Sequence, residues 1–165
     1  MHATHRIVII GGGTAGVTVA AKLRRARPEL DIALVEPADT HYYQPGFTLV
    51  GAGSARLADL GRATDGLIPQ GVHHYRATAT GIDPQAQTVH LDGDDELAYD
   101  WLVLAPGIGC DWDAIPGLAE AIGRNGVCSN YAPGTVSYTW ECLRHFRGGR
   151  MLFTQPPAPI KCPGA

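Results

Sequence analysis

The sequence contains no long hydrophobic run. None of its apolar stretches approaches the roughly 20 residues that a helix needs to cross a bilayer. The N-terminal apolar stretch, residues 7–10, is short and leads directly into three glycines, unlike the apolar core of a secretory signal peptide. The sequence therefore predicts a cytoplasmic protein.

An excess of charge of one sign is also lacking. Only 18% of the 165 residues are charged, and the formal net charge is −3. Binding of nucleic acid needs a basic surface, and this slightly acidic balance does not supply one. We therefore expect no nucleic-acid partner.

Metal-binding and dithiol motifs are missing as well. The seven histidines include no H-E-x-x-H pattern, and the four cysteines include no C-x-x-C pair. The sequence therefore predicts neither a metal site nor a thioredoxin-like motif. In a reducing compartment the thiols are expected to be free unless one of them is catalytic. The cysteines are Cys110, Cys128, Cys142 and Cys162.

Glycine, by contrast, is abundant. The chain has 21 glycines and 12 prolines, and 45% of its residues are apolar. Glycine usually makes up about 7% of a protein, so this chain has nearly twice the normal share. The apolar fraction is typical of a globular core, and the length fits one domain, or one domain plus part of a second.

The first part of the chain has the pattern of a β-α-β unit. Residues 6–10 are a short apolar run typical of a buried strand, and residues 31–35 predict a second one. Residues 17–26 between them are rich in Ala, Leu, Lys and Arg, which predicts a helix. Such a unit implies two parallel strands joined by a right-handed crossover.

A glycine-rich turn separates the first strand from the helix. In this turn Gly11 permits a tight bend, Gly13 lets the backbone approach a pyrophosphate, and Gly16 lets the helix pack closely on the strand. Glu36 follows the second strand, where its carboxylate can accept hydrogen bonds from ribose hydroxyls. The alternative is a structural turn beside an exposed glutamate. The motif indicates a dinucleotide and leaves NAD and FAD open.

The rest of the chain is less regular. Residues 38–70 predict no regular structure, and Gly148-Gly149 ends a predicted amphipathic helix over residues 135–146. A strand at residues 151–154 is followed by no further element, which favours an N-terminal part of a longer protein over an edge strand with a free tail. The other predicted strands are residues 72–79, 87–91 and 99–104.

Three segments have sequences that point to one family. The first is Ile7 to Gly16 together with Val35-Glu36-Pro37. The second is His41 to Pro45 together with Thr48 to Gly53. The third runs from Ser129-Asn130-Tyr131 through Trp140 to Pro159–Ala165. Together they resemble the sulfide:quinone oxidoreductases, flavoproteins of the disulfide-reductase-like superfamily, in the branch that includes the mitochondrial enzymes. The first segment is shared across the superfamily, and the other two are specific.

The resemblance implies an α/β fold and FAD as the cofactor. Residues 1–110 would form a three-layer, Rossmann-like FAD-binding half with a parallel sheet and a β-meander. Residues 111–165 would be a connecting segment and the truncated start of a second, similar domain. By position, Thr14 and Ala15 would meet the pyrophosphate, and Glu36 would hold the adenosine ribose. The remaining implied contacts are Gln44 along the flavin, the backbone of Ala79 at the adenine, and the turn Ala105-Pro106-Gly107.

The resemblance also implies a sulfur chemistry. Cys162 would take up sulfide sulfur as a persulfide, and electrons would pass through the flavin to quinone, with sulfite or a thiol as the sulfur acceptor. The second thiol and a peripheral contact with the inner membrane would belong to a later part of the family's chain, so this chain alone is not expected to be active. Cys128 is a candidate for sulfur relay or an ordinary loop thiol.

The residues around the thiols bear on these roles. Lys161 directly precedes Cys162 and favours its thiolate, and the surrounding prolines stiffen the backbone. The alternative is a cysteine on a free tail. Cys142 is expected to pack on its helix and Cys110 to be incidental. The sequence suggests no acid or metal partner for four of the histidines, which are His41, His73, His74 and His90.

The sequence leaves three alternative functions to consider. An NADH:quinone oxidoreductase would need a second G-x-G-x-x-G after residue 154, where the chain instead has prolines that lack N–H donors. A flavocytochrome-linked sulfide dehydrogenase fits residues 41–53 less well. The third alternative is a nucleotide-binding module without catalysis.

Overall fold

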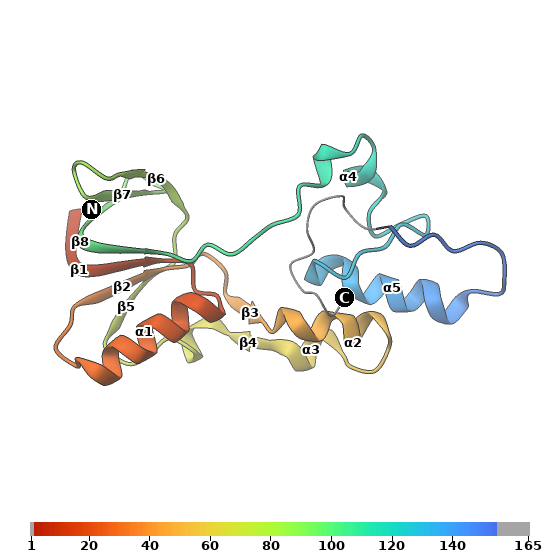
Figure 1. Ribbon diagram of the computed structural model, residues 1–165, viewed down its shortest axis with the longest axis horizontal. Coiled ribbons are helices and arrows are strands. Elements are labelled where there is room, and N and C mark those ends of the chain that lie inside the picture. Colours follow the sequence, from red (N-terminus) through yellow and green to blue (C-terminus); the bar gives the residue numbers. More distant parts are fainter. Residues whose placement is uncertain (1, 155–165) are drawn as a thin grey trace.

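The computed structural model describes residues 2–154, and one sheet of six strands organises its larger half (Figure 1). The strand order is β5-β2-β1-β8-β7-β6. Four strands, β5, β2, β1 and β8, run parallel, whereas β8, β7 and β6 form an antiparallel meander. The strands are β1 His2–Ile10, β2 Ile32–Val35, β5 Val72–Tyr75, β6 Ala79–Asp83, β7 Thr88–Leu91 and β8 Glu96–Leu104.

The parallel strands are covered on both faces, which explains why they are apolar without interruption. Helix α1, Thr14–Ala26, packs on one face, where Ala20 contacts a cluster that includes Ile9 and Leu34. The alternate residues of the same strands, among them Val8 and Val35, pack on the other face against the meander. The expected three-layer α/β fold with a parallel sheet and a meander is therefore confirmed.

A smaller helical region lies beside the sheet and is joined to it by a two-stranded ribbon (Figure 1). The ribbon consists of β3, Thr40–Tyr42, and the antiparallel β4, Gly61–Ala63. The apolar core of the helical region is a cluster of Phe47, Val50 and Val136. The region contains α2 Phe47–Gly51, α3 Leu57–Leu60, α4 Leu118–Ala121 and α5 Pro133–His145. Within residues 2–154 the short 3-10 turns are η1 Gln44–Gly46, η2 Thr64–Gly66 and η3 Trp112–Ala114.

Several elements differ from the sequence prediction. The chain between residues 38 and 70 forms short helices and the ribbon, where no regular structure was expected. The single strand predicted over residues 72–79 is two strands, β5 and β6. The strand predicted at 151–154 is wrong: these residues have no regular structure, and Leu152 and Phe153 are 81% and 87% exposed. A strand needs a neighbouring backbone to pair with, and none of the described strands lies beside this segment.

Within residues 2–154, the structure has no helix whose length and apolar character would let it cross a membrane.

Candidate dinucleotide-binding site

The site begins at the tight turn between β1 and α1. Gly11 has a φ of +101°, and a Cβ on it would overlap the carbonyl of Ala105 at the end of β8. A Cβ on Gly16 would overlap the carbonyl oxygen of Gly11 and crowd Ile9. Only glycine permits these approaches, because any side chain would push the helix off the sheet. The turn therefore brings the start of α1 directly against the carboxyl ends of β1 and β8.

The first turn of α1 presents unsatisfied backbone donors. Gly13 is the N-cap, no side chain caps the helix, and its first turn contains no acidic residue. The space around Gly13 is open, since a Cβ there would meet no atom within 4 Å. Thr14 and Ala15 are exposed. Free N–H groups and the positive end of the helix dipole are the donor set that a pyrophosphate requires, so this cradle fits a dinucleotide.

Glu36 is held beside the glycine turn by two backbone hydrogen bonds. The N–H of Gly12 donates to its Oε2 at 2.8 Å, and the N–H of Ala38 donates to its Oε1 at 2.8 Å. A hollow of about 110 Å³ lies here, lined by Glu36, Gly13 and Thr40 among others. Each carboxylate oxygen has a further lone pair, so Glu36 can still accept hydrogen bonds from hydroxyl groups of a ligand.

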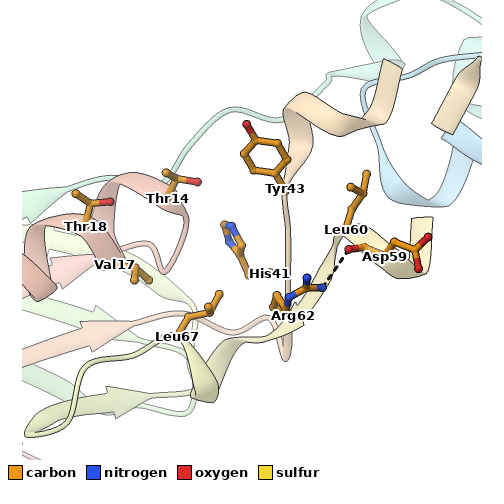
Figure 2. A pocket seen from close by; sticks show the side chains of 9 residues that line it. All are labelled: Thr14, Val17, Thr18, His41, Tyr43, Asp59, Leu60, Arg62 and Leu67. Atoms are coloured by element: carbon orange, nitrogen blue, oxygen red, sulfur yellow. Dashed lines mark hydrogen bonds between the residues drawn. The ribbon is translucent and has the colours of Figure 1, made fainter. Parts of the chain in front are cut away.

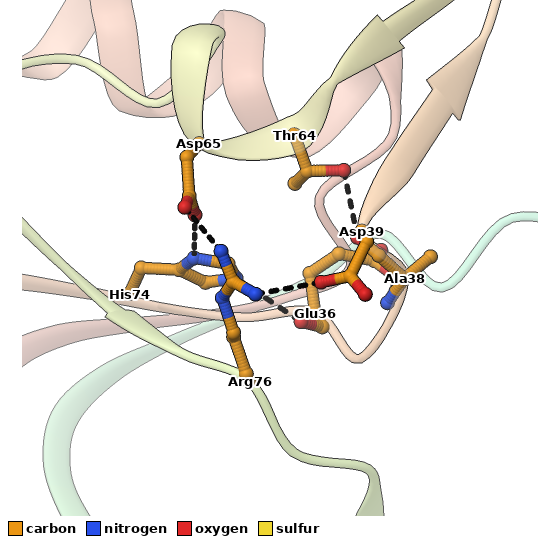
Figure 3. A network of polar contacts seen from close by, with 7 residues as sticks. All are labelled: Glu36, Ala38, Asp39, Thr64, Asp65, His74 and Arg76. Carbon is orange, nitrogen blue, oxygen red and sulfur yellow. Dashed lines mark hydrogen bonds and ion pairs between the residues drawn. The ribbon is translucent and has the colours of Figure 1, made fainter.

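A polar network fixes the end of β2 where Glu36 is attached (Figure 3). His74 lies between Asp65 at 2.9 Å and the backbone carbonyl of Glu36 at 3.0 Å. Arg76 donates to Asp39 at 2.7 Å and also to Asp65. The hydrogen bond with His74, followed in size of effect by the one from Arg76, holds the pKa of the Asp65 carboxyl below its usual value. The network therefore positions Glu36 from three separate segments.

A larger hollow of about 400 Å³ opens between α1 and the ribbon (Figure 2). Thr14 and Thr18 of α1 line one wall, and His41, Tyr43 and Arg62 line the other. Arg62 donates to the backbone carbonyls of residues 59 and 61, at 3.0 and 2.7 Å. The hollow adjoins the first turn of α1, and a cation on its wall adds to the attraction for an anionic ligand.

Sequence reasoning missed several residues of this site. Thr18, Thr64 and Arg62 line the two hollows, and His74 orients the chain behind Glu36. None of them belongs to a motif with fixed spacing, so only the fold brings them to the glycine turn. A weak signal was the run of polar side chains around His73 and His74.

The structure also places the three other candidate cofactor residues, which are Gly107, Gln44 and Ala79. Gly107 has a φ of +77° and follows Ala105, whose N–H donates to the carbonyl of Ile10 at 2.8 Å, so its turn adjoins the turn at Gly11. Gln44 begins η1 and is exposed next to Tyr43. Ala79 begins β6 and packs against the apolar cluster under the meander, and it lines neither hollow.

Two segments singled out by sequence pack together in the helical region. A Cβ on Gly51 would overlap the side chain of Asn130, and one on Gly53 would come within 2.5 Å of the Trp140 ring. Gly53 also has a φ of +76°. Residues 47–53 and 130–140 therefore form one unit, which requires glycine at the contact.

Three of the four thiols fall within the described residues. Cys128 is half-buried in the loop before α5, and its Sγ–H donates to the carbonyl of Gly126 at 3.6 Å. Burial, together with the neighbouring thiol of Cys142, raises the pKa of Cys128 to about 11. Cys142, expected to pack on its helix, is half-buried, and Cys110 is exposed. Cys162 lies outside the described residues.

Comparisons with known proteins agree with this architecture. A family model described as pyridine nucleotide-disulphide oxidoreductase matches residues 5–132. The mitochondrial sulfide:quinone oxidoreductase of Mus musculus is 37% identical over 161 residues, which cover 98% of this chain and 36% of that protein. The corresponding protein of Dictyostelium discoideum is also 37% identical, over 97% of this chain and 36% of its own length.

A solved structure gives the same fold. The sulfide:quinone oxidoreductase of Aquifex aeolicus superposes with a TM-score of 0.71 at 24% identity, over 85% of this chain and 32% of that one. The chain thus spans about a third of the length of the relatives that it matches. The resemblance to sulfide:quinone oxidoreductases is confirmed, and with it the expectation of an FAD-binding flavoprotein fold. The chain belongs to the pyridine nucleotide-disulphide oxidoreductase family.

Proposed function

We propose that the whole protein is an FAD-dependent sulfide:quinone oxidoreductase and that this chain supplies its first dinucleotide-binding half. The observation that carries the proposal is the glycine turn of α1 with Glu36 beside it, on a chain similar to such enzymes over nearly its whole length. We assign residues 1–110 to this half and residues 111–165 to the connection and the start of a second domain.

FAD binding in this proposal uses the donors of the turn and the carboxylate of Glu36. The turn with Gly11, Gly13 and Gly16 lets the pyrophosphate approach the N–H groups of Thr14 and Ala15. Glu36 accepts hydrogen bonds from the adenosine ribose, and its anchoring by Gly12 supports this role. The other proposed contacts are Gln44 along the flavin, the Ala79 backbone at the adenine and the turn at Gly107.

The sulfur chemistry in this proposal is centred on Cys162. Its thiolate and sulfide would form the S–S bond of a persulfide with the loss of two electrons to the bound flavin, and the outer sulfur would then pass to sulfite or to another thiol. FAD, when bound, would supply this two-electron oxidation, and quinone would reoxidise it. Lys161 favours the thiolate of Cys162. The raised pKa of Cys128 makes its thiolate, the reactive form, less accessible than that of an ordinary cysteine, which favours the loop-thiol interpretation over sulfur relay.

The membrane contact belongs to the same proposal. Quinones are hydrophobic and reside in membranes, so we propose that the whole protein contacts the inner membrane peripherally. The part of the family's chain beyond this one would make that contact.

Flavin binding tests the cofactor assignment. The protein, extended by its downstream sequence, is purified and its visible absorbance recorded. We expect a flavin spectrum and at least about 10-fold weaker FAD binding by Glu36→Ala, because a hydrogen-bonded charge is lost. Glu29→Ala, at an exposed glutamate paired with Arg27 at 3.3 Å, is the matched control and should bind normally. An extended protein that never takes up FAD contradicts the assignment.

Sulfide-dependent bleaching of that flavin tests the catalytic assignment. Cys162→Ser in the extended protein should abolish bleaching, whereas Cys110→Ser, at an exposed thiol, should leave it unchanged. Bleaching that persists in Cys162→Ser removes this residue from the mechanism. Normal FAD binding without any bleaching by sulfide would contradict the sulfide activity and leave the cofactor assignment standing.

A further inference from the structure

Three metal-ligating side chains meet at the end of the sheet away from the glycine turn. His5 lies on β1, Asp31 directly precedes β2, and His73 is the second residue of β5. Because β1, β2 and β5 are parallel, these residues share the amino-terminal side of the sheet, whereas Gly11 and Glu36 follow the carboxyl ends. At about 3.3 Å per residue, His5 and Gly11 are separated by roughly 20 Å of strand.

The ligand atoms of this cluster lie close to the spacing found in a metal site. The Nδ1 of His5 lies 3.0 Å from both carboxylate oxygens of Asp31. The Nε2 of His73 lies 3.3 Å from Asp31 Oδ1, and the three ligand atoms all lie within 4.8 Å of one another. In a tetrahedral zinc site with bonds of about 2.0–2.1 Å, neighbouring ligand atoms are about 3.3 Å apart. Small side-chain adjustments would therefore enclose an ion.

The ring of His5 is already oriented for this role. His5 is only 6% exposed, and its Nε2 lies 2.8 Å from the hydroxyl of Tyr75. Metal-bound histidines usually make such a hydrogen bond through the second ring nitrogen, which fixes the ring and the protonation state. Here the bond aims Nδ1 at Asp31.

A second histidine–carboxylate group on the same sheet provides an internal comparison. Glu96 lies 3.1 Å from His2 and 3.0 Å from His90. In the part of the chain that the structure describes, however, only His5, Asp31 and His73 bring three such ligand atoms within 4.8 Å of one another. Ion pairing between histidine and a carboxylate therefore does not by itself create this geometry.

We propose that His5, Asp31 and His73 form a binding site for a divalent transition-metal ion of the zinc type. Two imidazole nitrogens and one carboxylate oxygen supply the protein ligands, and water completes the coordination. The ion would clamp β5 and β2 to β1 and stabilise the folded chain by mass action. No motif search finds this site, because its ligands are 26 and 42 residues apart in sequence.

Titration with Zn²⁺ tests the proposal. The tag-free protein is freed of metal with a chelator and titrated in competition with a chromophoric chelator. We expect one Zn²⁺ per chain and at least 10-fold weaker binding by His73→Ala. The His73 side chain is 61% exposed, so this variant should keep the fold, which circular dichroism checks. His90→Ala is the matched control and should bind Zn²⁺ normally.

Two further measurements separate a clamp from other zinc binding. Zn²⁺ should raise the unfolding temperature of the unaltered protein and of His90→Ala, but not of His73→Ala. Zn²⁺ binding that disappears when the thiols are alkylated would come from cysteines and would overturn the proposal. So would absent binding, binding unchanged by His73→Ala, or binding lost in His90→Ala.

Discussion

The sheet region (β1, β2, β5–β8 and α1) and the helical region (α2–α5) bury their apolar side chains to very different extents. The sheet region has two clusters, one on each face of the parallel strands, with Val8, Ile9 and Leu34 fully buried. The helical region has one cluster with three buried residues, and Tyr131 remains 60% exposed. Stability is therefore expected to be concentrated in the sheet region, and the helical region should open first.

The largest contrast should come from two glycines in the first turns of helices. Gly16→Ala in α1 places a methyl group inside the carbonyl of Gly11, so we expect a loss of about 4 kcal/mol or more in the free energy of unfolding. Gly134→Ala in α5 meets no atom within 4 Å and should be neutral or stabilising by up to about 1 kcal/mol. Urea unfolding measures both, and equal effects would contradict the contrast.

Truncation of the two cores should sharpen the comparison. Leu34→Ala removes a fully buried side chain from the sheet, and we expect it to lower the free energy of unfolding by about 3 kcal/mol. It should also lower the protection of backbone amides from hydrogen exchange in both regions. Val136→Ala removes a buried side chain from the smaller cluster and should cost about 2 kcal/mol. Hydrogen exchange should show the second loss only in α2 and α5. A global loss of protection in Val136→Ala would mean that the two regions unfold as one unit.

Thiol reactivity should distinguish the half-buried Cys128 from the exposed Cys110. With a pKa of about 11, Cys128 is protonated at pH 7.5, so we expect it to alkylate about 100-fold more slowly than exposed Cys110. Its rate should rise with pH through that value. Cys142→Ser removes a neighbour that raises the pKa and should speed the reaction. Mass spectrometry after timed alkylation measures both rates, and equal rates at pH 7.5 would contradict the burial argument.

The smallest effect is expected for a surface carboxylate of the polar network. The folded-state pKa of Asp65 is lowered by His74 and Arg76, so its contribution to stability is present above the unfolded pKa of about 4 and is lost as the pH falls through the folded value. Asp65→Asn should therefore lower the urea midpoint at pH 7, and the difference should vanish in acid. Asp113→Asn, at an exposed carboxyl of η3, should change neither. A deficit that persists in acid would have another cause.

The local parts of the fold could be predicted from sequence. The β-α-β unit has two strands with uninterrupted apolar runs and a glycine turn, and both signals lie within adjacent residues. The split between β5 and β6 was not predicted: between the two strands the N–H of Thr78 donates to the carboxylate of Asp92 at 2.8 Å, a contact between distant residues that has no local sequence signal. The strand predicted at residues 151–154 was wrong for a related reason: the local sequence pattern does not show that none of the described strands lies beside these residues.

The candidate site divides in the same way. Gly11, Gly16 and Glu36 were found because the motif has a fixed spacing. The partners of the histidines were not found from the sequence. His73 pairs with Asp31, which is 42 residues away, and His74 pairs with Asp65, which lies in a turn with no diagnostic sequence. Side-chain pairs of this kind become visible only when the strand order is known.

The central position of β1 has a consequence for how the chain folds during synthesis. Its register joins His2 to Glu96 and Ile10 to Leu104, so one edge of the first strand waits for nearly a hundred further residues before it is paired. The early helix and β2 can associate with it sooner, but the sheet closes only when β8 leaves the ribosome. Until residues 96–104 have left the ribosome, the nascent chain therefore exposes an unpaired apolar edge, which favours association with other chains.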